Sequence, residues 1–224
     1  MLILLKMSTL KLSCNPIDNL LGTGIESGII TKIYGEAGVG KTNFCLQTSR
    51  NCVNNGGIVA YIDTEGASIV RLNQICQEKY DYKKILDNIL FFNPNSLEKQ
   101  EKTISEAIKI NGVKLIVVDT INLFYRFNLE DDTEGTMRSF NRQVANLQIA
   151  AREKDLYVIL TEQVYTDKNG EIKPFTNRET EHMAKTIIKL EKIGIGKRKA
   201  TIIKHRSQPE GKNALFKITE KGLE

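Results

Sequence analysis

The sequence lacks the features that would mark a secreted, membrane-spanning or disordered protein. No tryptophan, internal repeat or low-complexity segment is present. The apolar start, Met1–Leu5, is too short for a signal-peptide core or a membrane span. Hydrophobic residues make up 41% of the chain and charged residues 26%, which is ordinary for a globular protein and argues against disorder. We therefore expect a globular, cytoplasmic protein that does not enter a membrane.

Cysteine is also scarce and is not arranged in pairs. No C-x-x-C motif is present, and the spacing suggests no disulfide framework or metal site. We expect reduced, mostly buried thiols. The four cysteines are Cys14, Cys45, Cys52 and Cys76.

Length and charge leave several possibilities open. The 224 residues suffice for one domain with a substantial core. The net charge of +5 permits contact with nucleic acid but does not by itself indicate it. At the start of the chain, Met7 is an alternative first residue, and Leu2–Leu5 could instead form an edge strand or bind a partner.

Strand-like and helix-like stretches alternate along most of the chain, which predicts an α/β fold with a mainly parallel sheet flanked by helices. Shorter apolar–polar runs near the end predict an antiparallel extension of that sheet. The predicted strands are Ile29–Tyr34, Gly57–Asp63, Asn88–Phe92, Lys114–Asp119, Tyr157–Thr161, Thr186–Ile193, Lys199–Ile203 and Ala214–Ile218. The predicted helices are Lys41–Asn54, Ser68–Lys79, Leu97–Lys109 and Thr136–Glu153.

A complete G-x-x-x-x-G-K-T phosphate loop lies between the first of these strands and the first of these helices. Its glycines let backbone N–H groups surround a polyphosphate, and the helix start adds the positive end of its dipole. We expect Lys41 to reach the β- and γ-phosphates of ATP and the Thr42 hydroxyl to hold Mg²⁺. The predicted nucleotide-binding residues here are Gly35, Glu36, Ala37, Gly38, Val39, Gly40, Lys41, Thr42 and Asn43.

Carboxylates end two other predicted strands. Asp119 ends a buried apolar strand and is expected to bind Mg²⁺ directly or through water. Asp63 and Glu65 are predicted to lie on one side of the strand before them. Either could orient the water that attacks ATP, and we favour Glu65 because it is nearer the following loop.

Two segments after strand ends fit neither helix nor strand, and such long loops are usually functional. They are Phe124–Gly135 and Val164–Glu181. Gln163 immediately precedes the second segment. There it could contact the γ-phosphate and couple nucleotide state to the loop.

Basic residues are frequent late in the chain and indicate a second candidate site, one that binds DNA. Lysine and arginine outnumber glutamate between Arg178 and Arg206. Electrostatic contact with DNA phosphates is one reading of such a cluster, and a solvated strand face is the other. The candidate DNA-binding residues are Lys168, Lys173, Arg178, Lys197, Arg198 and Lys199.

Five motifs in this order resemble the ATPase core of the RecA/RadA recombinase family. They are GEAGVGKT at 35–42, YIDTEG at 61–66, LIVVDT at 115–120, LTEQV at 160–164 and PEG at 209–211. The resemblance implies a RecA-like P-loop fold over 1–224, with 1–20 as a lead-in and no separate N-terminal DNA-binding domain. It makes Glu65 the catalytic glutamate, with Lys41 and Gln163 also acting in catalysis, and it makes the two irregular segments DNA-facing loops.

The resemblance also has departures that bear on function. The Phe-x-x-Ala polymerisation motif of RadA is missing, which argues against a filament and leaves a homodimer open. The first loop is acidic, with Arg126 as its only base, and phosphates repel such a loop. Lys204 stands where RadA-like proteins have an aspartate that caps a neighbour's ATP. We expect its ammonium to replace a bound cation and reach ATP across a subunit contact.

The leading interpretation is a weak, Mg²⁺-dependent ATPase that binds DNA, with single strands preferred, and assists RadA in recombination and repair. The alternative is a non-hydrolysing, ATP-switched regulator that docks on RadA or on a nuclease. The acidic first loop favours the alternative, whereas Glu65 and the basic C-terminal region favour the enzyme.

Overall fold

The described part of this computed structural model covers residues 8–77, 79–175 and 178–224. Its main feature is a sheet of nine strands in the order β13-β12-β11-β10-β3-β7-β6-β4-β5. The strands from β10 to β5 run parallel, and β11, β12 and β13 add antiparallel partners. The strands are β3 Ile29–Tyr34, β4 Ile58–Asp63, β5 Ile89–Phe92, β6 Val113–Asp119, β7 Tyr157–Glu162, β10 Thr186–Lys192, β11 Lys197–Lys204, β12 Asn213–Thr219 and β13 Gly222–Leu223.

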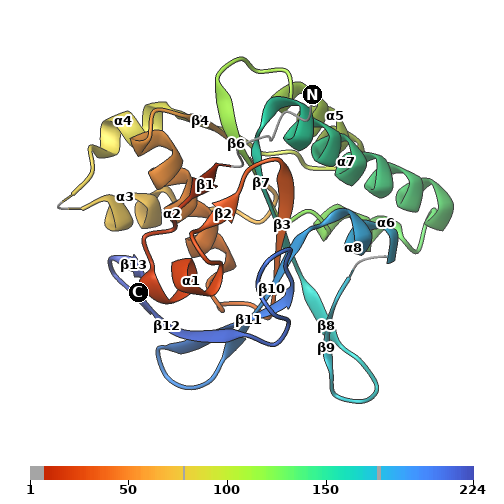
Figure 1. Cartoon of the computed structure of the whole chain (residues 1–224). Helices are drawn as coiled ribbons and strands as arrows, with labels where there is room; N and C mark the ends of the chain where they lie inside the picture. The colour runs from red at the N-terminus through yellow and green to blue at the C-terminus, as the bar shows by residue number, and fades with distance from the viewer. Residues whose placement is uncertain (1–7, 78, 176–177) are drawn as a thin grey trace, which may run out of the picture.

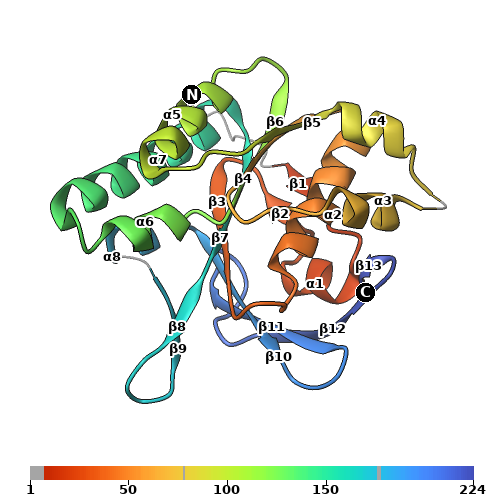
Figure 2. The same ribbon diagram turned by 180° about the vertical axis from the view of Figure 1, so that it is seen from behind.

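Helices cover both faces of this sheet (Figure 1). One apolar cluster lies on the face covered by the first four helices, and a second lies under α5 and α7. The view from behind shows the same two layers with the sheet between them (Figure 2). The helices are α1 Asn15–Leu20, α2 Lys41–Asn54, α3 Ile69–Cys76, α4 Tyr82–Asp87, α5 Leu97–Ala107, α6 Leu123–Asn128, α7 Thr133–Lys154 and α8 Arg178–Met183.

The central strands are apolar because both of their faces are covered, as is usual for a parallel sheet. In β6, every residue from Leu115 to Asp119 is buried. Alternate residues of each strand enter opposite clusters: Leu115 and Val117 pack toward α2, whereas Ile116 and Val118 pack toward α7. The predicted mainly parallel sheet with its C-terminal extension is therefore confirmed, although β10 pairs in parallel with β3 and is not itself antiparallel to the central sheet.

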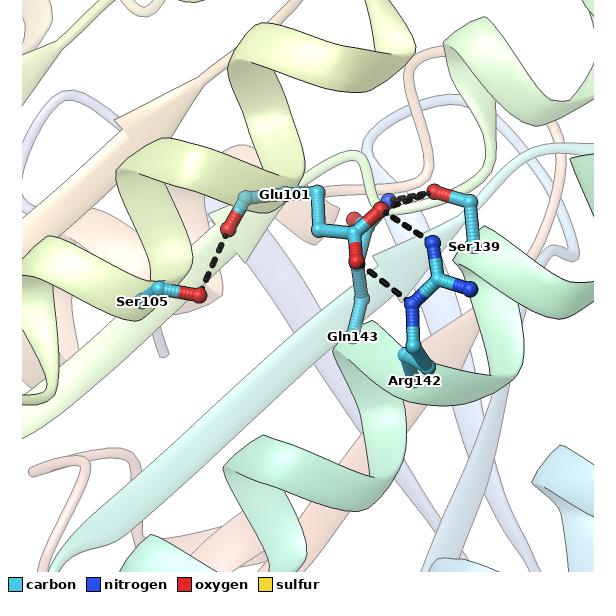
Figure 3. Close-up of polar contacts among 5 residues, drawn as sticks. All are labelled: Glu101, Ser105, Ser139, Arg142 and Gln143. Atoms are coloured by element: carbon cyan, nitrogen blue, oxygen red, sulfur yellow. Dashed lines mark hydrogen bonds and ion pairs between the residues drawn. The ribbon is translucent and has the colours of Figure 1, made fainter.

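Polar contacts join α5 to α7 on the outside of the second cluster (Figure 3). The Glu101 carboxylate accepts hydrogen bonds from Arg142 Nε at 2.8 Å and from Ser139 Oγ at 2.5 Å. The Arg142 guanidinium lowers the pKa of Glu101. Deeper in the same interface, Gln100 Nε2 donates to the Ile121 carbonyl at 3.0 Å, so the helix pair also fixes the segment that follows β6.

Both segments predicted to be irregular contain regular structure. Most of Phe124–Gly135 lies in α6 and the start of α7. The α7 helix begins earlier than predicted because Asp132 caps it by accepting a hydrogen bond from the Gly135 N–H. The short α6 helix is held by tertiary packing, since Tyr125 stacks on Phe140 with ring centroids 4.4 Å apart.

The second segment, Val164–Glu181, holds a hairpin and most of α8. The hairpin strands are β8 Val164–Thr166 and β9 Ile172–Pro174. Asp167 closes their turn by accepting hydrogen bonds from the N–H groups of Asn169 and Glu171, each at 2.9 Å. These local contacts gave no periodic signal in the sequence.

The lead-in also folds onto the domain. The structure places β1 Thr9–Leu10 against β2 Ile25–Glu26, and α1 follows β1. Leu12 and Ile17 are fully buried there. The alternatives for Leu2–Leu5 and Met7 lie outside the described residues. All four cysteines are buried free thiols, as predicted, and no helix in the described ranges is long and apolar enough to cross a membrane.

The burial pattern of α7 predicts opposite outcomes for two nearby substitutions. Leu147 is fully buried, whereas Ile149 is 52% exposed. Leu147→Ala should lower the free energy of unfolding by about 2–5 kcal/mol, because it removes core contacts and leaves a cavity. Ile149→Ala is the matched control and should change it by less than about 0.5 kcal/mol. Urea denaturation measures both, and equal losses would contradict the placement of α7.

Candidate nucleotide-binding site

The carboxyl ends of four neighbouring parallel strands meet at one edge of the sheet. The phosphate loop follows β3, Asp63 ends β4, Asp119 ends β6 and Gln163 follows β7. The strand register aligns Asp63 with Asp119 across β4 and β6. Parallel pairing therefore places the predicted site residues together. They lie at the edge of the sheet where ligands of open α/β sheets bind.

The phosphate loop needs glycine at specific positions. Gly38 and Gly40 have φ angles of 72° and 108°, which disfavour other residues. At Gly35, an added Cβ would lie 2.2 Å from the Leu190 carbonyl oxygen, so the backbones pack too closely for a side chain. The loop leads directly into α2, whose first residue is Lys41.

Lys41 is buried under the loop and turned toward its carbonyls. Its Nζ donates hydrogen bonds to the Gly35 oxygen at 2.7 Å and the Glu36 oxygen at 3.0 Å. Burial lowers the pKa of Lys41, while the carboxylates of Glu65 and Asp119 oppose that shift. The ammonium is thus held at the mouth of the loop by acceptors that a phosphate oxygen can replace.

Asp119 is a buried carboxylate held from three elements. Tyr61 of β4 donates to its Oδ2 at 2.8 Å, and Thr161 of β7 donates to its Oδ1 at 2.5 Å. Burial raises the pKa of Asp119, whereas hydrogen bonding from Thr161, Tyr61 and Thr42 lowers it. Thr42 and Asp119 therefore lie together, as a shared Mg²⁺ site requires.

The two acids at the end of β4, Asp63 and Glu65, have different roles. Asp63 accepts hydrogen bonds from the N–H groups of Glu65, Gly66 and Ala67, at 3.2, 2.8 and 2.6 Å. It therefore holds the turn after β4. The prediction that both acids lie on one side of the strand is wrong, since β4 ends at Asp63 and Glu65 lies exposed in the turn.

Glu65 belongs to a chain of polar contacts across the site. Its Oε1 accepts from the Thr120 hydroxyl at 3.2 Å and also from Gln163 Nε2. Gln163 Oε1 in turn accepts from Arg126 Nη1. The Arg126 guanidinium lies over the Phe175 ring, 4.2 Å from its centroid. The structure thus brings Glu65 and Gln163 together and connects them to the segment after β9.

A cavity of about 750 Å³ opens in front of these residues. It is bounded by the start of the phosphate loop, the turn after β4, α6 and the start of β8. Its lining includes Gly35, Glu36, Ala37, Lys41, Thr64, Glu65, Arg126 and Gln163. Its size falls within the range of small-molecule sites.

Two arginines have contacts in or beside the site that the sequence does not predict. In the sequence, Arg126 is only the single base of an acidic segment. Arg71 of α3 donates to Asn43 Oδ1 at 2.5 Å and to the Thr219 carbonyl at 2.6 Å, joining α2 to the end of β12. No sequence motif identified either contact, because both depend on how distant segments pack.

Several of the candidate DNA-binding residues already have intramolecular partners. Lys173 pairs with Asp167 and with Glu171, and Lys199 pairs with Glu191 at 3.0 Å. Arg198 Nη2 donates to the Gly38 carbonyl at 3.0 Å. Lys168, Lys173 and Lys197 are the exposed candidates, and of these Lys173 has the acidic partners just named. Arg178 begins α8, and its side chain lies outside the described part.

Lys204 lies away from the phosphate loop of its own chain. Its Nζ donates to the Glu181 carbonyl at 3.1 Å. Partial burial lowers the pKa of Lys204, and the nearby Lys185 and Lys32 lower it further. Any contact with ATP would therefore have to come from a second copy.

Comparison with known proteins identifies the family to which this site belongs. The Rad51 family model matches residues 4–224. This chain belongs to the Rad51 family. A solved structure described as the RadB recombinase has the same fold, with a TM-score of 0.85 and 33% identity, and the match covers 96% of this chain and 98% of that one.

Curated Rad51-family relatives are similar over most of their length. The DNA repair and recombination protein RadB of Methanococcoides burtonii is 45% identical, over 94% of this chain and 95% of that protein. The protein of the same name from Thermoplasma acidophilum is 38% identical, over 92% and 90%. The predicted fold and recombinase family are confirmed. The matches support a role in DNA repair and recombination and do not favour the docking regulator.

The contrast between the two acids after β4 predicts a difference in stability. Asp63→Ala should lower the free energy of unfolding by roughly 1–3 kcal/mol, because three backbone N–H groups lose a charged acceptor. Glu65→Gln should change it by less than about 0.5 kcal/mol, since the exposed amide can keep similar contacts. Urea denaturation tests this, and a larger loss for Glu65→Gln than for Asp63→Ala would contradict the assignment.

Proposed function

We propose that the chain binds Mg·ATP at the strand-end site, hydrolyses it slowly and uses it while acting on DNA in recombination and repair. The observation that carries this proposal is the convergence of the phosphate loop, Glu65 and Gln163 on one cavity, with Asp119 buried beside Thr42 of the loop. Family membership supports nucleotide binding with Mg²⁺.

The residues present suit a triphosphate with a hard divalent cation. The loop from Gly35 to Thr42 presents its N–H groups at the start of α2, and Lys41 supplies a positive charge. The Thr42 hydroxyl and Asp119 carboxylate supply the oxygen ligands that Mg²⁺ prefers. Mg²⁺ would offset the negative charge that develops on the phosphate oxygens.

Glu65 would hold the attacking water. Its exposed carboxylate borders the cavity opposite the phosphate loop, and its hydrogen bonds to Thr120 and Gln163 fix its orientation. Phosphoryl transfer depends mainly on positioning and charge stabilisation, so a carboxylate and a cationic loop suffice. Because Gln163 faces both Glu65 and the cavity, a γ-phosphate would compete for its amide and change its contacts with Arg126.

DNA would approach through the segments that follow β6 and β7. The exposed Lys168 on the β8–β9 turn and Lys197 at the start of β11 are the better-supported phosphate contacts. Lys173 and Lys199 would first have to leave their acidic partners. We propose single-stranded DNA and a RadA-type recombinase as partners, with a nuclease as a further candidate. We also propose that Lys204 reaches the nucleotide of a second copy.

ATP turnover with and without single-stranded DNA tests this function. Glu65→Gln should keep ATP affinity and reduce turnover by about 10²-fold, the contribution of a positioned general base. Lys41→Ala should lose ATP affinity itself. Turnover should rise when DNA is added to the wild type.

One result would instead support the alternative function. Tight ATP binding with negligible turnover, unchanged by DNA or by Glu65→Gln, would point to a nucleotide-switched docking protein. A structure of an ATP-bound assembly with Lys204 remote from every nucleotide would contradict its proposed role.

The salt dependence of DNA binding tests the electrostatic contacts. Replacing Lys168 or Lys197 by alanine should reduce the slope of log affinity against log salt by about 0.7 for single strands, because each contact releases counterions. Lys102→Ala is the control, since that side chain is 77% exposed on α5, away from these segments. An affinity indifferent to salt, or equal slopes in all variants, would contradict the proposal.

A further inference from the structure

The phosphate loop lies against the C-terminal strands at three glycines, Gly35, Gly38 and Gly40. The start of the loop meets β10, where a Cβ on Gly35 would lie 2.2 Å from the Leu190 oxygen. Its end meets β12 and β13, where a Cβ on Gly40 would lie 3.1 Å from Ile218 and 3.4 Å from Leu223. The strands β10, β12 and β13 therefore support the loop from one side.

The middle of the loop lies beside a cross-strand pair of basic residues, one of which bonds to it. Lys192 ends β10 and pairs in register with Arg198 of β11, just before the turn between these strands. Arg198 Nη2 donates to the Gly38 carbonyl at 3.0 Å, and its Nη1 donates to the Lys197 carbonyl at 3.0 Å. Lys192 Nζ lies 3.5 Å from where a Gly38 Cβ would be.

This contact acts on the part of the loop that is hardest to hold. Gly38 has a φ of 72°, and glycine has more conformational freedom than any other residue. A charge-assisted hydrogen bond to its carbonyl fixes the peptide plane that follows, and with it the direction of the Val39 N–H. Loop amides that already point inward bind phosphate with a smaller ordering cost.

The same geometry argues against Arg198 as a primary DNA contact. Two of its nitrogens are committed to backbone carbonyls, and its Nε is buried. A DNA phosphate would compete with the loop carbonyl for the same guanidinium. Among the basic residues near this turn, Lys192 and Lys197 are exposed.

We propose that Arg198 is a positioning residue for nucleotide binding, which clamps the phosphate loop to the β10–β11 hairpin. This inference rests on the proposed binding of ATP at the loop. It predicts that Arg198 sets nucleotide affinity without taking part in the chemical step, and that nucleotide binding in turn stabilises the hairpin.

Three variants test the clamp: Arg198→Ala, Arg198→Lys and, as the matched control, Lys217→Ala. Lys217 is an exposed lysine on β12, and removing it deletes a charge without touching the loop. Arg198→Ala should weaken ATP binding and raise KM about tenfold, the typical effect of one hydrogen bond to a charged group, with kcat unchanged. Arg198→Lys should restore most of the affinity, and Lys217→Ala should match the wild type.

Hydrogen exchange of the phosphate loop provides a second readout that does not depend on ATP. Peptides covering residues 35–42 should exchange about tenfold faster in nucleotide-free Arg198→Ala than in the wild type or in Lys217→Ala. Urea denaturation should show that Arg198→Ala stays folded.

The outcomes separate this inference from the proposed function. If the wild type binds ATP and Arg198→Ala binds it equally well with equal loop exchange, the clamp is refuted. A fall in kcat at unchanged KM also refutes it. If the wild type does not bind ATP, the proposed function fails, and the exchange comparison alone supports or refutes the clamp.

Discussion

The site depends on one buried carboxylate. Asp119 lies at the end of the central strand β6, where it accepts hydrogen bonds from Tyr61 on one neighbouring strand and Thr161 on the other. Burial disfavours its charge and raises its pKa. A nearby cation stabilises a carboxylate in such a place: Lys41 at the mouth of the loop supplies one, and a Mg²⁺ ion on Thr42 would supply a second. The strand register that places Asp119 also aligns it with Asp63. Gln163 follows the neighbouring strand β7 and lies at the same edge.

Much of this arrangement could be predicted from sequence because it is local or repeats along the chain. The phosphate loop is one continuous segment, and buried parallel strands are continuous apolar runs. Because these strands run in the same direction, Lys41, Asp119 and Gln163 could be predicted to lie at one edge of the sheet. The different roles of Asp63 and Glu65 could not be predicted in this way. They depend on which carboxylate accepts hydrogen bonds from the N–H groups of the turn.

The contacts that sequence reasoning missed join distant segments through side chains. Arg126 meets Gln163 through the packing of α6, Arg71 joins α2 to β12, and Arg198 reaches the phosphate loop from β11. The hairpin after β7 was missed because it is short and held by turn contacts of Asp167, and α8 because it has only six residues. Three basic residues predicted to contact DNA have intramolecular partners: Lys173 and Lys199 pair with acidic side chains, and Arg198 contacts the phosphate loop.

The proposed function requires Mg·ATP in the cavity between the phosphate loop and Glu65. A crystal structure with Mg²⁺ and a slowly hydrolysed ATP analogue tests it most directly. We predict the triphosphate within the loop of residues 35–42, the metal ion between Thr42 and Asp119, and the Gln163 amide turned toward the γ-phosphate. An analogue bound elsewhere, or one bound in the loop with Glu65 and Gln163 remote from the γ-phosphate, would contradict the account.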